Sequence, residues 1–96
     1  MADDLAKKSG YEYLAACSRA MQHAVRLVDA RGAAVNVDID PVNASPYLAT
    51  HHIQLTYGRA TRTIAVDHET FMNDEFFRTL VLHQIEAAID DLAASA

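Results

Sequence analysis

The stretch HHIQLTYGRATRTIAV, residues 51–66, decides the fold. Apolar side chains recur at every second residue on both sides of Gly58 and Arg59, which is the period of a half-buried β-strand. A two-residue type II′ turn at Gly58-Arg59 places Ile53 opposite Ile64, so that the apolar side chains of both strands share one face. A three-residue loop would set apolar against polar residues. The sequence therefore predicts a β-hairpin whose inward face carries His51, Ile53, Leu55, Tyr57, Arg62, Ile64 and Val66.

A third strand precedes the hairpin in the chain. Val35, Val37 and Ile39 alternate with polar residues, and Asp40-Pro41 ends the pattern. Residues 41–50 then form a loop that is long for a strand connection. We expect a three-stranded antiparallel sheet with one apolar face and one polar face.

A helix is predicted on the N-terminal side of the sheet. Ser9 and Glu12 fit a capping box, and Gly32 supplies the stop. We therefore expect a loose segment at residues 1–8 and a single α+β domain at residues 9–96. The predicted buried stripe of this helix consists of Tyr13, Leu14, Cys17, Met21, Ala24, Val25 and Val28.

A second helix is predicted from Asn73 to about Ala94, with either Asp67 or Asn73 capping its first turn. Its apolar positions span an arc of about 240°, more than one sheet and one neighbouring helix can cover. A surplus apolar surface of this size is commonly buried by two-fold pairing. The sequence thus predicts a homodimer whose interface contains Phe76, Leu80, Leu82, Ile85 and Ile89.

These elements predict an α+β fold of order α-β-β-β-α, with both helices on the apolar face of the sheet. The double-stranded RNA-binding domain has the same order, which is an analogy of topology alone. Glu69, Asp74 and Glu75 stand where that domain needs cations to meet phosphates. The formal charge of the 96-residue chain is −5, which also argues against a nucleic-acid partner.

Composition restricts the remaining classes of protein. The single cysteine, Cys17, excludes a disulfide framework, and its place in the apolar stripe suits a small buried side chain. No apolar run approaches the length of a membrane span, and the first residues do not resemble a secretory signal. We expect a cytoplasmic protein that has no cofactor and no membrane partner.

The histidines carry no metal motif of the HxxxH or HExxH type, so no metal ligand is predicted. His23 and His83 fall on the polar sides of their helices, and His68 is expected in a helix-start turn. By strand parity, His52 shares the polar face of the sheet with three carboxylates. The predicted polar cluster consists of Asp38, Asp40, His52 and Asp67.

The long loop offers a second candidate site. Asn43, Ser45 and Tyr47 form a possible recognition loop, because a loop with an exposed aromatic is suited to binding. Alternatively, Tyr47 and Leu48 fold back over the edge of the sheet. Without a catalytic motif, the sequence favours a small non-catalytic module that acts by homodimerisation or protein-partner binding. The alternative is a small enzyme or metal-binding protein that uses the polar face around His52.

Overall fold

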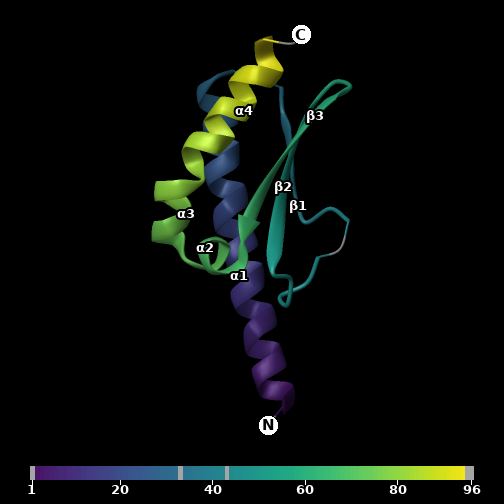
Figure 1. Cartoon of the computed structure of the whole chain (residues 1–96), viewed down its shortest axis with the longest axis vertical. Helices are drawn as coiled ribbons and strands as arrows, with labels where there is room; N and C mark the ends of the chain where they lie inside the picture. The colour runs from purple at the N-terminus through teal and green to yellow at the C-terminus, as the bar shows by residue number, and fades with distance from the viewer. Residues whose placement is uncertain (1, 33, 43, 95–96) are drawn as a thin grey trace.

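The computed structural model describes residues 2–32, 34–42 and 44–94, with side chains from Gly10 onward. Three strands form an antiparallel sheet of order β1-β2-β3, and four helices pack beside it (Figure 1). The elements are α1 (Ala2–Ala30), β1 (Asn36–Ile39), β2 (Thr50–Tyr57), β3 (Ala60–Asp67), α2 (His68–Met72), α3 (Asp74–Leu80) and α4 (Leu82–Ala94). The predicted three-stranded antiparallel sheet in a mixed α and β fold is confirmed.

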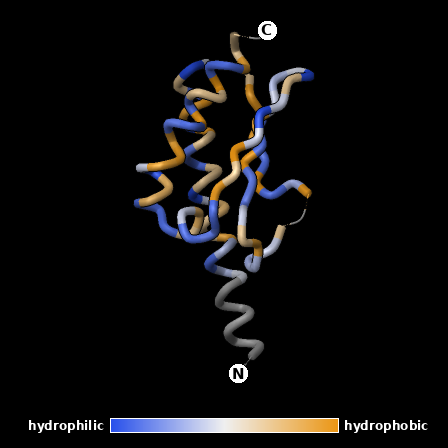
Figure 2. Tube along the Cα trace, viewed as in Figure 1, coloured by the Kyte–Doolittle hydropathy of each residue, from blue (hydrophilic) through white to orange (hydrophobic). Residues whose placement is uncertain are grey.

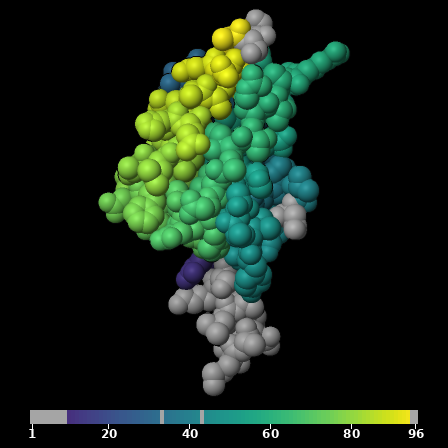
Figure 3. Space-filling view, in the orientation of Figure 1, coloured from purple at the N-terminus to yellow at the C-terminus, as the bar shows by residue number. Residues whose placement is uncertain are grey.

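The hairpin has the register that the sequence predicts. Ile53 pairs with Ile64, and Tyr57 pairs with Ala60 across the turn. A type II′ turn requires a positive φ at its first central residue only. Gly58 has a φ of 60°, and Arg59 does not have a positive φ. The tip of the hairpin extends beyond the body of the molecule (Figure 3).

The first helix begins at Ala2, earlier than the predicted start at Ser9. Alanine, leucine and lysine are frequent before Ser9 and favour helix strongly, so the capping box does not mark the start. The loose segment expected at residues 1–8 stays a prediction. At its other end, α1 is followed by Gly32 with a φ of 60°, the predicted stop.

The buried stripe of α1 is rotated from the predicted one. Its buried residues are Tyr13, Ala16, Ala20, Ala24 and Val28, whereas Leu14 and Val25 are exposed. Three alanines one turn apart let the helix backbone approach its neighbours closely, which explains why the larger side chains face outward.

The predicted second helix is divided into three helices. Both proposed caps are used: Asp67 accepts from Thr70 N–H before α2, and Asn73 accepts from Phe76 N–H before α3. The later break, at Val81, coincides with a change in the hydrogen bonding of Gln84. Gln84 Nε2 donates to Leu80 O at 3.0 Å, while the backbone N–H of Gln84 donates to Val81 O instead.

The buried stripe of the C-terminal region is narrower than the apolar arc that the sequence predicts. The residues buried along α3 and α4 are Phe77, Val81, Ile85, Ile89 and Leu92. They pack with α1 and the inward face of β2 and β3 in a single core, and apolar segments of helices and sheet face one another in Figure 2. None of the described helices combines the length and the hydropathy that a bilayer crossing needs.

Candidate functional site

Asp40 leaves the polar face of the sheet and turns inward. Its backbone N–H donates to His52 O at 2.8 Å, so its main chain lies opposite His52. Its φ, however, is 46°, the only positive value of a non-glycine among the described residues. This left-handed conformation, which aspartate tolerates, rotates the carboxylate into the interior, where its side chain is 1 % exposed. The predicted placement of Asp40 on the outer face is therefore wrong.

The carboxylate of Asp40 joins a chain of buried polar side chains from four segments. Tyr13 OH donates to Asp40 Oδ2 at 2.6 Å, and Nδ1 of His51 lies 2.7 Å from the same oxygen. On the far side of the ring, Nε2 of His51 lies 2.8 Å from Nδ1 of His68. We call Tyr13, Asp40, His51 and His68 the buried histidine chain.

Two aromatic rings pack against His51 and also against each other. Phe71 stacks on the imidazole with ring centroids 4.3 Å apart, and Tyr13 stacks at 5.4 Å. The His51 side chain is fully buried, so its polar atoms depend on protein partners for hydrogen bonds. Asp40 and His68 supply those partners.

The charge state of Asp40 follows from its three donors. Burial alone would raise its pKa, but hydrogen bonds from Tyr13 and His51, together with the His52 N–H at 2.7 Å from Oδ1, outweigh burial and lower the pKa below its ordinary value. Burial, and then the hydrogen bond to Asp40, raise the pKa of Tyr13. Asp40 is therefore a carboxylate beside a neutral phenol, and both of its oxygens are engaged.

The remaining members of the predicted polar cluster are not brought together. Asp38 is exposed and pairs with Gln54, whereas Asp67 pairs with Thr50 at the start of β2. The Thr70 hydroxyl donates to Asp67 at 2.8 Å and lowers the pKa of that carboxyl, which caps α2. No group of three potential metal-ligating side chains forms among the described residues.

A cavity of about 470 Å³ lies on the outer face of the sheet, beside His52. Its floor is polar and comes from β2 and β3, while its wall is apolar and comes from the loop that follows β1. The lining residues are Asp40, Pro41, Val42, Leu48, Thr50, His52, Gln54 and Thr63. The volume falls within the range of small-molecule sites.

The loop forms this wall without covering it. Val42 is 97 % exposed at the cavity, and Tyr47 is 72 % exposed. Ser45 Oγ accepts from Tyr47 N–H at 3.2 Å and orders the loop locally. Asn43, the third residue of the predicted recognition loop, lies outside the described residues. The exposure of Tyr47 does not support the alternative in which it covers the sheet edge.

No family model, curated protein or solved structure matches the chain. The geometry of the chain itself therefore carries the functional argument.

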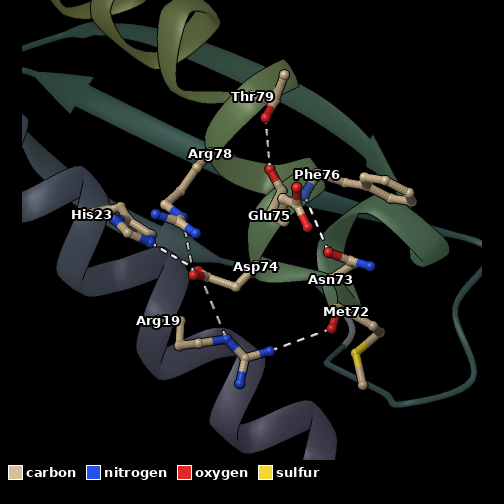
Figure 4. A network of polar contacts seen from close by, with 9 residues as sticks. All are labelled: Arg19, His23, Met72, Asn73, Asp74, Glu75, Phe76, Arg78 and Thr79. Atoms are coloured by element: carbon tan, nitrogen blue, oxygen red, sulfur yellow. Dashed lines mark hydrogen bonds and ion pairs between the residues drawn. The ribbon is translucent and has the colours of Figure 1, made fainter.

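A second polar cluster fastens α3 to α1 (Figure 4). Asp74 Oδ1 lies 2.9 Å from His23 Nε2, and Asp74 Oδ2 lies 3.1 Å from Arg78 Nε. Arg19 lies 3.9 Å from the same carboxylate and also donates to Met72 O. His23 additionally stacks on Phe77, so it is not the solvated residue that the sequence predicted. His23, Arg19 and Arg78 all face the carboxylate of Asp74, so this cluster joins α1 to α3.

The predicted interface residues divide into two groups. Ile85 and Ile89 are fully buried within one chain, so they are unavailable to a second copy. They lie on the buried stripe of α3 and α4 together with Phe77, Val81 and Leu92. Leu82 is half-buried, while Phe76 and Leu80 remain 42 % and 53 % exposed.

The buried histidine chain was not predicted from the sequence, although two of its residues gave an indication of it. His51 has inward parity in the hairpin, and a histidine on an apolar face requires a polar partner. Tyr13 heads the apolar stripe of α1. The missing information was the backbone conformation of Asp40, for which the alternating pattern up to Ile39 gives no warning.

Proposed function

We propose that this chain is a binding module for a small, mainly apolar molecule with a polar edge, held in the cavity on the outer face of the sheet. The observation that carries the proposal is the near-complete exposure of Val42 at the rim of that cavity. Covering an exposed apolar side chain with a ligand removes it from water and so makes the free energy of binding more favourable.

The lining indicates the chemistry of the ligand. Pro41, Val42 and Leu48 offer an apolar wall to a flat ring or a short aliphatic group. Thr50, Gln54 and Thr63 offer hydroxyl and amide groups that donate and accept hydrogen bonds. The Asp40 carboxylate is already paired, so we expect an uncharged ligand whose polar groups face the floor and His52.

The experiment is a screen of uncharged aromatic fragments such as indole, benzimidazole and phenol, followed by ¹H–¹⁵N correlation spectra. The proposal expects shifts concentrated at Val42, His52 and Thr63. Thr63→Trp fills the cavity and should abolish binding. The matched control is Thr61→Trp, which lies on the same strand and face but outside the lining. Equal binding by the two variants, or shifts spread over other surfaces, would refute the assignment.

Self-association is the second candidate, and it rests on a different surface. Phe76 and Leu80 lie one turn apart on α3 and are both exposed. Residues at this spacing lie on the same side of a helix and together form an apolar patch. We propose that a second copy of the chain covers this patch, an arrangement that needs neither Ile85 nor Ile89.

A further inference from the structure

The buried histidine chain is attached to both ends of the loop that walls the cavity. At the start of the loop, the Asp40 carboxylate accepts hydrogen bonds from Tyr13, His51 and the His52 N–H. At its end, His68 N–H donates to Ala49 O at 3.0 Å. The contact between His51 and His68 therefore connects the two points at which the loop joins the fold.

The number of protons that this contact can hold follows from its geometry. A carboxylate only accepts hydrogen bonds, so Nδ1 of His51 carries a hydrogen directed at Asp40. Nε2 of His51 faces Nδ1 of His68 at 2.8 Å, and one hydrogen lies between these two nitrogens. One excess proton leaves that hydrogen bond intact, because either ring can carry the charge while the other accepts.

A second excess proton is incompatible with the contact. Both facing nitrogens would then carry a hydrogen, and two imidazolium ions would meet N–H against N–H at hydrogen-bonding distance. His51 is fully buried and packs against Tyr13 and Phe71, so water cannot separate the two imidazole rings in place. Relief requires His68 to move away from His51, and the backbone N–H of His68 is the group that holds Ala49 O.

The other titratable groups around the pair do not remove this conflict. Tyr13 and Cys17 on α1 have pKa values raised by burial and stay neutral. Asp40, after β1, provides one buried negative charge, enough to balance one proton. Asp67, at the end of β3, is exposed and directs its carboxylate at Thr70.

We propose that the Asp40–His51–His68 contacts form a proton-operated latch on the loop at residues 41–49. With no more than one excess proton on the two rings, the latch is closed and both loop ends are held. Uptake of a second proton opens the contact between His51 and His68 and frees the end of the loop at Ala49. The latch as such is independent of any ligand, and only its role in regulating the cavity rests on the proposed function.

The test is amide hydrogen exchange, measured by NMR on the ligand-free chain. Spectra at about pH 7.5 and about pH 5 bracket the ordinary histidine pKa of about 6.5. The amide that reports on the latch is His68 N–H, which donates to Ala49 O at the end of the loop. After correction for intrinsic exchange, its protection should fall about tenfold or more at the lower pH. His68→Asn keeps an amide near the position of Nδ1 but does not titrate, so its protection should be the same at both pH values.

His83→Asn is the matched control, since His83 is exposed on α4, and this variant should behave like the wild type. The latch is refuted if wild-type protection does not change, or if His68→Asn retains the wild-type change. Imidazole ¹⁵N shifts of the wild type give a measurement that does not depend on the folding of a variant. The hydrogen-bonded shifts of His51 Nε2 and His68 Nδ1 must disappear together with the protection of the His68 amide, and their persistence when that amide is unprotected would also refute the latch.

Fragment binding then separates the two proposals. A latch that opens in a chain that binds no fragment contradicts the proposed function alone. Fragment affinity that is the same at both pH values, in a chain whose loop opens, contradicts regulation of the cavity by the latch.

Discussion

Nδ1 of His51 lies 2.7 Å from Oδ2 of Asp40, in a pair whose side chains are 0 % and 1 % exposed. The two residues are eleven positions apart and come from opposite ends of the loop that walls the cavity. This buried pair holds both ends of the loop against the core. Neither side chain can replace its partner with water unless the fold opens.

Removing the charge of Asp40 should therefore destabilise the protein strongly. Asp40→Asn replaces one acceptor oxygen by an amide donor that opposes the donors of Tyr13 or His51, and we expect a loss of about 3–5 kcal/mol. The measurement is urea-induced unfolding at neutral pH. Asp38→Asn, an exposed change two residues earlier, should alter stability by no more than about 0.5 kcal/mol. Similar losses in the two variants would show that the Asp40 contacts contribute little.

The same carboxylate predicts a pH dependence. Its pKa is lower in the folded than in the unfolded chain, so its contribution is present above the ordinary aspartate pKa of about 3.9 and is lost as the pH falls through the folded pKa. The stability difference between wild type and Asp40→Asn should persist at about pH 5 and shrink below about pH 3.9. A difference that grows on acidification would contradict the assigned charge state.

The Asp74 cluster that joins α1 to α3 should contribute much less to the free energy of unfolding than Asp40 does. The hydrogen bond from His23, followed by the charges of Arg78 and Arg19, lowers the pKa of Asp74, but this carboxylate is 37 % exposed. Solvent screening limits the loss in Asp74→Asn to about 1 kcal/mol, and added salt should reduce it further. Thermal unfolding at low and high ionic strength measures both effects, with Glu75→Gln as the unpaired neighbouring control. A salt-independent loss would indicate that capping or packing, rather than charge, is responsible.

Much of the sheet was predictable because the hairpin is governed by local rules. A period of two and a two-residue turn determine together which residues face each other, and Ile53 opposite Ile64 follows directly. Asp40 escaped prediction because a single dihedral angle reverses its side chain while leaving its backbone register unchanged. The break at Val81 was not predicted because residues 73–94 contain no glycine or proline that would mark it. The residue pattern shows neither the dihedral angle of Asp40 nor this break.

Two glycines offer substitutions of opposite sign. Gly58→Ala forces a side chain into the left-handed region at a φ of 60° and should cost about 1–2 kcal/mol. Gly10→Ala lies inside α1 with open space around the added methyl group, and should stabilise the chain by about 0.5–1 kcal/mol. Both changes are read from thermal unfolding, and helix content by circular dichroism should not fall in Gly10→Ala. A destabilising Gly10→Ala would contradict a continuous helix through that position.

Self-association should depend on α3 and not on the buried stripe of α4. We expect the wild type to sediment as a dimer at about 100 µM, and Leu80→Glu to sediment as a folded monomer, because the charge enters an exposed apolar patch. Leu14→Glu is the same substitution at an exposed position on α1, and this variant should remain dimeric. Ile89→Asp should instead unfold the chain, since it buries an unpaired carboxylate in the core. A monomeric wild type, or identical masses for Leu80→Glu and Leu14→Glu, would exclude the α3 patch as the contact.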